Sequence, residues 1–185
     1  MASWWMRMGR SAVPMTLCAS IALVAAMPGC DEQTATGVES VKLDGQWFHL
    51  ELVADPATRV KGLGGRDYIA PDGGMLFAFP SSQVLQFVMR DCLVPIDVIF
   101  LDPSGRILAM HQMPIEEPEP PQAEGESDED YRSRRIQYEL SLPKYTSRYS
   151  AQFAIELAGG TLEGLDLEVG QKVDLDVERL KTLAK

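Results

Sequence analysis

The longest strongly apolar run after the N-terminal segment spans residues 87–101, and charged side chains interrupt it. Arg90, Asp91 and Asp97 would each cost several kcal/mol to bury unless a partner compensated the charge. Pro95 divides the run into two strands, because proline has no N–H group for a sheet ladder. We therefore predict two neighbouring strands that enclose these three side chains in a mutually neutralising network.

Other segments have the pattern of short strands joined by tight turns. Polar and apolar residues alternate, or apolar residues run together, over short stretches: 47–54, 75–79, 84–89, 96–101, 106–113, 138–142, 152–157 and 172–177. Residues 102–105 (DPSG) have proline second and glycine fourth, as in a type I turn. We therefore predict a hairpin between the strands that flank this turn.

Helix signals are few. Asp55 can cap the free amides of a helix, Pro56 suits its first turn, and Gly62 ends it. Thr161 should cap a brief helix that ends at Leu165. Many short strands and two short helices predict a mainly β fold (β-rich α+β), arranged as a compact sandwich or distorted barrel.

Residues 114–136 depart from this pattern. The stretch is acidic and rich in proline, a composition that cannot form a packed core. We predict an exposed, mobile insertion with one helical turn from Ser127 through Arg135. The expected organisation is a single domain over residues 45–177, followed by a loosely helical tail at 178–185.

The N-terminal segment has the shape of a secretory signal. Arg7 and Arg10 precede a mostly apolar run at residues 13–27, which is too short to span a bilayer comfortably. The run ends in residues 27–30 (MPGC), which resemble a bacterial lipobox, so Cys30 would carry the lipid. We expect a signal peptide at 1–29, a flexible tether at 30–44, and a membrane-anchored lipoprotein facing the periplasm or cell exterior. Plain secretion and an uncleaved anchor remain open.

Cysteine use and charge agree with this interpretation. Cys92 is the one cysteine in the expected domain, so no disulfide can form within it, and its apolar surroundings favour a buried thiol. Removing residues 1–29 takes away two arginines and no acid, so the net charge falls from −10 to −12. A chain with this much negative charge does not favour binding to nucleic acid. The charge is expected to keep the protein soluble as a monomer.

Several blocks resemble a catalogued bacterial and archaeal family, the domain of unknown function family 192. The matching blocks are 62–66 (GLGGR), 74–80 (GMLFAFP), 87–102 (FVMRDCLVPIDVIFLD), 151–157 (AQFAIEL) and 167–173 (LEVGQKV). Their order and spacing agree with the family pattern over residues 46–177. The resemblance implies a compact, jelly-roll-like β-rich fold that is often exported, and it implies no established activity.

This chain departs from the family pattern around its polar motif. Lys61 replaces the usual arginine, Gly64 a methionine, Val88 a tryptophan, Asp91 an asparagine and Cys92 a threonine. A ligand shared by other members through this motif is therefore not implied here.

Two groups of residues are candidates for chemistry. The first is a polar cluster of Arg90, Asp91, Asp97, Asp102 and Arg66. With His111 nearby, a buried aspartate could form an acid–base couple, as in a hydrolase. A structural ion-pair network explains the same residues, and the chain lacks the usual nucleophile, phosphate-loop and dinucleotide motifs.

The second group is a possible Cu(I) site at Met89, His111 and Met113. Thioethers with one imidazole suit Cu(I), and the spacing resembles part of the pattern in periplasmic copper chaperones. That pattern needs a further ligand where this chain has Ala78, and methionines that fill a β-rich core are the alternative explanation.

A third possibility rests on the absence of catalytic motifs together with the expected anchor. We favour a non-enzymatic ligand-binding or interaction module at the cell envelope, without a cofactor, whose partner is a small ligand or an envelope protein. Cu(I) binding and an Asp/His hydrolase are the alternatives. The basic, glycine-rich turn around Lys61 and Arg66 is either a solvated surface or a site that receives a carboxylate.

Overall fold

A computed structural model describes residues 37–185. The expected signal peptide at 1–29, the lipid site at Cys30 and the first part of the tether lie outside the described residues. No helix within 37–185 is both long enough and apolar enough to cross a membrane.

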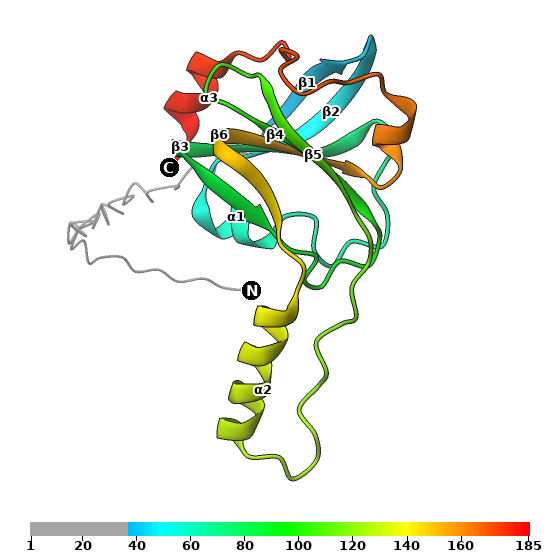
Figure 1. The fold of residues 1–185 in the computed structure, drawn as a ribbon, viewed down its shortest axis with the longest axis vertical. Helices are drawn as coiled ribbons and strands as arrows, with labels where there is room; N and C mark the ends of the chain where they lie inside the picture. Colours follow the sequence, from blue (N-terminus) through cyan, green and yellow to red (C-terminus); the bar gives the residue numbers. More distant parts are fainter. Residues whose placement is uncertain (1–36) are drawn as a thin grey trace, which may run out of the picture. The chain divides into compact units, whose positions relative to one another are not determined.

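The described chain forms one six-stranded mixed sheet with short helices around it (Figure 1), in the strand order β1-β2-β3-β6-β4-β5. The strands are β1 Val38–Leu43, β2 Gln46–Val53, β3 Gly73–Phe87, β4 Ile96–Leu101, β5 Ile107–Met113 and β6 Tyr145–Ala158. Strands β2 and β3 are parallel, and helix α1 (Pro56–Lys61) lies in the connection between them. All other neighbours pair antiparallel. The predicted mainly β class is confirmed.

Apolar clusters cover both faces of the sheet. One contains Leu76 and Ile155, and the other contains Phe77 and Ala154. Because adjacent residues of a strand point to opposite faces, the central strand β6 is buried on both sides from Ala151 to Leu157. Polar residues in this part of β6 are therefore enclosed as well.

Several local predictions are confirmed. Strands β4 and β5 form the expected hairpin, and the Asp102 carboxylate accepts hydrogen bonds from the amides of Ser104 and Arg106 in the turn. Helix α1 begins as predicted, because Asp55 accepts a hydrogen bond from the Thr58 amide at 3.0 Å.

The predicted tether at 30–44 is wrong in its second half, where Val38–Leu43 forms the edge strand β1. Val41 and Leu43 are buried against the core. The turn that joins β1 to β2 is Asp44–Gly45, with φ of 43° and 79°. Such an Asp-Gly pair is a strong hairpin signal, although it was not among the predicted turns.

The predicted strand boundaries in β3 and β6 are also wrong. Segment 75–79 and residues 84–87 of the other segment belong to one strand, β3, which continues through Pro80 and ends at Phe87. Proline is tolerated there because β2 pairs with β3 only as far as Phe77, and because the β3–β6 register shifts after Ala78. Strand β6 begins at Tyr145, seven residues before the predicted strand at 152–157.

The insertion contains more helix than predicted. Helix α2 spans Asp128–Ser141 and takes in all but the last residue of the expected strand at 138–142. Ser127 caps it by accepting a hydrogen bond from the Asp130 amide, and three acidic residues occupy its first turn. Local capping and favourable charge near the helix N-terminus outweigh a short alternating pattern. None of its residues is buried, so the predicted exposure is observed, and α2 protrudes from the sheet (Figure 1).

The C-terminal part differs from the prediction in two respects. Segment 172–177 forms no strand, apart from one bridge between Arg106 and Lys172. Thr161 begins the short 3-10 helix η1 (Thr161–Gly164) rather than capping it. The predicted C-terminal helix is present as α3 (Val177–Leu183), but it is docked, because Leu180 is only 1% exposed in the core.

Candidate functional site

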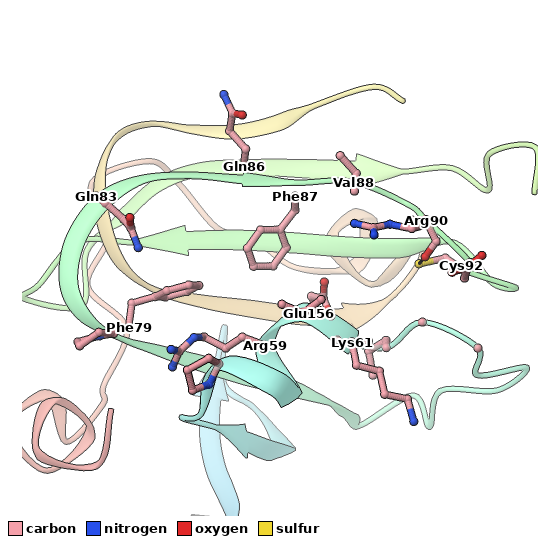
Figure 2. A pocket seen from close by; sticks show the side chains of 18 residues that line it. Arg59, Lys61, Phe79, Gln83, Gln86, Phe87, Val88, Arg90, Cys92 and Glu156 are labelled. Carbon is pink, nitrogen blue, oxygen red and sulfur yellow. Dashed lines mark hydrogen bonds between the residues drawn. The ribbon is translucent and has the colours of Figure 1, made fainter. Parts of the chain in front are cut away.

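A groove of about 820 Å³ lies along helix α1, and we call it the α1 groove (Figure 2). Its walls come from α1, the glycine-rich loop at 62–65, the second half of β3 and the segment 88–92 that follows it. Glu156 of β6 also lines it and lies between these walls (Figure 2). The volume is within the range typical of small-molecule sites.

Glu156 is the most unusual residue of the groove. It lies on the central strand opposite Met75 of β3 and Val98 of β4, so its sheet neighbours are apolar. The residue is 7% exposed, and its Oε2 is buried without a hydrogen-bond partner. Burial raises the pKa of Glu156 from 4.5 to about 7, although the Leu63 amide and Arg66 act in the opposite direction. Near neutral pH this carboxyl group can accept a hydrogen bond, hold a cation or exchange a proton.

Gly62 allows the loop after α1 to lie directly against this carboxylate. Its φ of 51° is rarely adopted by other residues. A Cβ atom at this position would lie 3.3 Å from Oε2 of Glu156 and 3.6 Å from the Phe77 ring. The glycine therefore provides both the turn that ends α1 and the space for the glutamate.

Aromatic side chains form the apolar part of the groove. Phe87 lines it and makes edge-to-face contacts with the buried rings of Phe77 and Phe100, at centroid distances of 5.3 and 5.2 Å. Phe79, which is also on β3, lines the groove where the guanidinium of Arg59 lies 5.2 Å from its ring centre. The groove thus combines apolar surfaces with a single buried carboxylate.

The arginines around the groove already have partners. Arg59 donates hydrogen bonds to the carbonyls of Ala54 and Ala78 at 2.7 and 3.0 Å, and also to Lys185 at the C-terminus. Arg90 forms an ion pair with Glu139 of α2 at 3.1 Å.

Arg66, which the sequence analysis assigned to the polar cluster, forms a two-pronged pair with Glu51 of β2, at 2.6 and 2.7 Å. The predicted cluster is therefore wrong. Asp91 is exposed, with φ of 55°, and Asp102 serves the β4–β5 turn.

Asp97 is buried, as predicted, but its partner is not an arginine. Its carboxylate accepts a hydrogen bond of 2.7 Å from the Leu162 amide and so holds the start of η1. Burial raises its pKa, whereas the amides of Leu162, Gly160 and Thr161 act in the opposite direction. Backbone amides at a helix start satisfy an aspartate as well as a guanidinium does, and sequence alone does not distinguish the two partners.

The candidate copper ligands lie in or beside one apolar cluster. Met89 and Met113 are each 1% exposed within it. His111 lies between the rings of Phe100 and Tyr145, and its Nε2 is 2.8 Å from the Thr146 carbonyl oxygen. Among residues 37–185, no three histidine, cysteine or acidic side chains are placed to hold a metal ion. A site built from thioethers stays a prediction.

Cys92 is buried, as predicted. Burial raises the pKa of its thiol to about 11, and the nearby Glu156 and Asp91 contribute to the shift. A thiol with so high a pKa is almost entirely protonated at neutral pH and therefore a poor nucleophile.

Sequence reasoning missed Glu156. The alternating pattern of residues 152–157 suggested a strand with one solvated face, on which a glutamate is ordinary. Two signals were available: Glu156 is the one acidic residue in segment 151–157, and that segment is one of the blocks that resemble the family. Both faces of the sheet are covered, and this burial is what leaves the carboxyl group of Glu156 with almost no contact with solvent and raises its pKa.

Two solved structures are similar to this chain. One is that of a proposed transcription regulator from Sinorhizobium meliloti 1021, with 26% identity, a TM-score of 0.55, and coverage of 75% of this chain and 94% of that one. The other is a protein of unknown function from Novosphingobium aromaticivorans DSM 12444, with 21% identity, a TM-score of 0.58, and coverage of 82% and 94%. No curated protein matches the chain.

The resemblance found in the sequence blocks is confirmed by a family model. The DUF192 model, described as "Uncharacterized ACR", matches residues 39–175, which include the whole α1 groove and all the strands except the first residue of β1. The chain therefore belongs to the DUF192 family.

Proposed function

We propose that the protein is a small-molecule binding domain of the cell envelope, and that its ligand occupies the α1 groove. The observation that carries this proposal is Oε2 of Glu156, a buried acceptor without a partner at a groove large enough for an organic molecule. Leaving such an atom unsatisfied costs about 1–3 kcal/mol. Proteins tend to keep this kind of penalty where a ligand or a reaction uses the group.

The groove supports binding better than catalysis. A single buried carboxylate lies in it, and the nearby thiol of Cys92 is protonated at neutral pH. The aromatic surfaces of Phe79 and Phe87 suit an apolar ligand body. The Sinorhizobium meliloti neighbour is described as a proposed transcription regulator, but this acidic chain does not favour binding to nucleic acid.

A thermal-shift screen of the purified protein against amines, sugars, short peptides and metal ions tests this function. Ligands that raise Tm should lose their effect in Glu156→Gln and in Val60→Trp, because Val60 is 79% exposed at the edge of the groove. The matched control is Val169→Trp, since Val169 is 66% exposed and does not line the groove. Shifts that survive both groove variants would contradict the proposal.

The envelope location is part of the proposal and rests on the N-terminal sequence. The lipobox-like residues 27–30 follow a signal-like apolar run, so the domain would be held at the membrane through a lipid on Cys30 and act as a monomer. Metabolic labelling with a fatty acid should mark the wild type and leave Cys30→Ala unmarked. Equal labelling, or none in the wild type, would contradict the anchor.

Cu(I) binding is the second candidate, and the placement of Met89 and Met113 in one cluster favours it. Titration against a competing Cu(I) chelator tests it directly. Binding that weakens in His111→Ala would support this candidate, and binding weaker than that of the chelator would exclude it.

A further inference from the structure

We infer that the ligand of the α1 groove carries a protonated amine, which Glu156 receives through its free oxygen; this inference rests on the proposed function. The charge distribution around the groove, the position of the carboxylate and the aromatic surfaces each point to this class of ligand.

The ionised carboxylate of Glu156 is a negative charge without a partner in the α1 groove. Oε2 of Glu156 has no hydrogen-bond partner and almost no contact with solvent. An ammonium group supplies both a donor and a compensating charge, and charged hydrogen bonds are roughly twice as strong as neutral ones. A ligand carboxylate or phosphate would instead place a second negative charge beside the first and leave Oε2 without a donor.

The positive side chains nearby do not reverse this preference. The guanidinium groups of Arg66 and Arg90 are each paired with a carboxylate, at 2.6 and 3.1 Å. Arg59 is held by backbone oxygens from three residues, including the C-terminal Lys185. Lys61 is exposed, and its side chain points away from the glutamate in Figure 2. An anionic ligand would therefore have to displace existing partners to gain a counter-charge.

The rest of the groove suits an amine with an apolar body. Aromatic faces attract cations, and the groove already contains one such contact, between Arg59 and Phe79. Phe87 offers a second aromatic surface. The volume of about 820 Å³ is larger than an inorganic ion needs. Within residues 37–185 no three histidine, cysteine or acidic side chains are placed to hold a metal ion, which favours an organic cation in this groove.

Binding should depend on pH through the same carboxyl group, whose pKa of about 7 lies near neutrality. The ionisable groups that surround it are Arg66, Lys61 and Arg59 from α1 and its loop, and Arg90, Asp91 and Cys92 from segment 88–92. The residues paired with it on β3 and β4 are Met75 and Val98, which do not titrate. Lowering the pH protonates Glu156 and removes the charge that attracts the amine.

Three probes with the same phenyl body test the class of ligand by calorimetry on the purified protein: phenethylamine, phenethyl alcohol and hydrocinnamate. At about pH 8 the amine should bind the wild type at least about tenfold more tightly than the alcohol, with the carboxylate weakest. Lowering the pH from about 8 to about 6 should reduce the affinity for the amine about tenfold, because the ionised fraction of Glu156 falls by that factor. Binding of the alcohol should change little.

Glu156→Gln keeps the length of the side chain and should abolish both the preference for the amine and its pH dependence. Glu163→Gln is the matched control, since Glu163 is exposed and does not line the groove. If Glu156→Gln does not fold, the pH series on the wild-type protein still tests the role of the carboxylate. If hydrocinnamate binds as tightly as the amine, the ligand class is wrong but the groove remains a binding site. If no probe binds, both the class and the proposed function are contradicted.

Discussion

A buried carboxylate with an unpartnered oxygen makes the ligand-free protein less stable than it would be with an apolar side chain of the same size at this position. The pKa of Glu156 is raised from 4.5 to about 7, which corresponds to roughly 3 kcal/mol of preference for the protonated form. Because the folded state holds this proton more tightly than the unfolded chain, stability is highest below about pH 4.5 as far as Glu156 is concerned. It is lost as the pH rises through about 7.

Glu156→Met should reveal this penalty, because methionine has a similar length and no charge. The advantage of the variant over the wild type in free energy of unfolding should grow by roughly 3 kcal/mol between about pH 4 and about pH 8. Urea denaturation at several pH values measures it, with Glu163→Met as the exposed control. Parallel curves for wild type and Glu156→Met would contradict the buried, ionisable state of Glu156.

Gly74 sets the close approach of β3 and β6 behind the same glutamate. A Cβ atom there would lie 2.1 Å from the Glu156 carbonyl oxygen and 3.1 Å from the Leu50 side chain, and φ is 152°. Gly74→Ala should therefore lower the free energy of unfolding by about 3 kcal/mol or more. Gly164→Ala, with nothing within 4 Å, is the control in the same denaturation experiment. A near-neutral Gly74→Ala would show that the two strands are not packed so closely.

Residue-level chemistry was only partly predictable from sequence. Asp97 and Cys92 were expected to be buried, and they are. The partners of Asp97 and Arg90 were not predictable, because a backbone amide and the distant Glu139 are brought to them only by the fold. Glu156 was missed for the same reason: its burial depends on which strands and helices cover β6.

Among the elements, the agreement with the prediction is limited to a few with clear local turn and cap signals. The start of α1 and the β4–β5 hairpin depend on a few neighbouring residues, and both are as expected. Strand β3 continues through Pro80 because one side of it is unpaired there, which no local pattern reveals. The α1 groove likewise forms between elements far apart in sequence, from α1 to β6.

Helix α2 and the acidic loop before it hold themselves together with little help from the sheet. Arg134 binds Glu126 and the carbonyls of Pro120 and Pro121, and Arg135 pairs with Glu119. At the base, the Tyr138 hydroxyl donates to the Glu117 carbonyl, so the two sides of this arm are close there.

Replacing residues 118–137 with a short Gly-Ser linker should therefore change the free energy of unfolding by less than about 1 kcal/mol, because α2 buries none of its residues. Removing residues 177–185 is the contrasting deletion. It takes away Leu180, which is 1% exposed, and should cost at least about 2 kcal/mol. Chemical denaturation of both deletions compares them. A large loss of stability from the arm replacement would show that the arm supports the core.

At the scale of the whole molecule, both faces of one sheet are covered, and the α1 groove opens beside the central strand β6. The mainly β class and the family were accessible from composition, turns and sequence blocks. The location of the site was not, because it requires the strand order β3-β6-β4 and the return of α1 over that part of the sheet. An acidic chain with a buried anion at its groove is consistent with a cationic ligand.

The most direct test of the central claim is an NMR titration of the Glu156 side-chain carboxyl carbon, with and without phenethylamine. In the free protein the midpoint should lie near pH 7, and the bound amine should lower it, because the ammonium group stabilises the carboxylate. A midpoint near the ordinary glutamate value of about 4.3, or one that does not move when the amine is added, would contradict the claim that this buried carboxylate is the ligand-binding group.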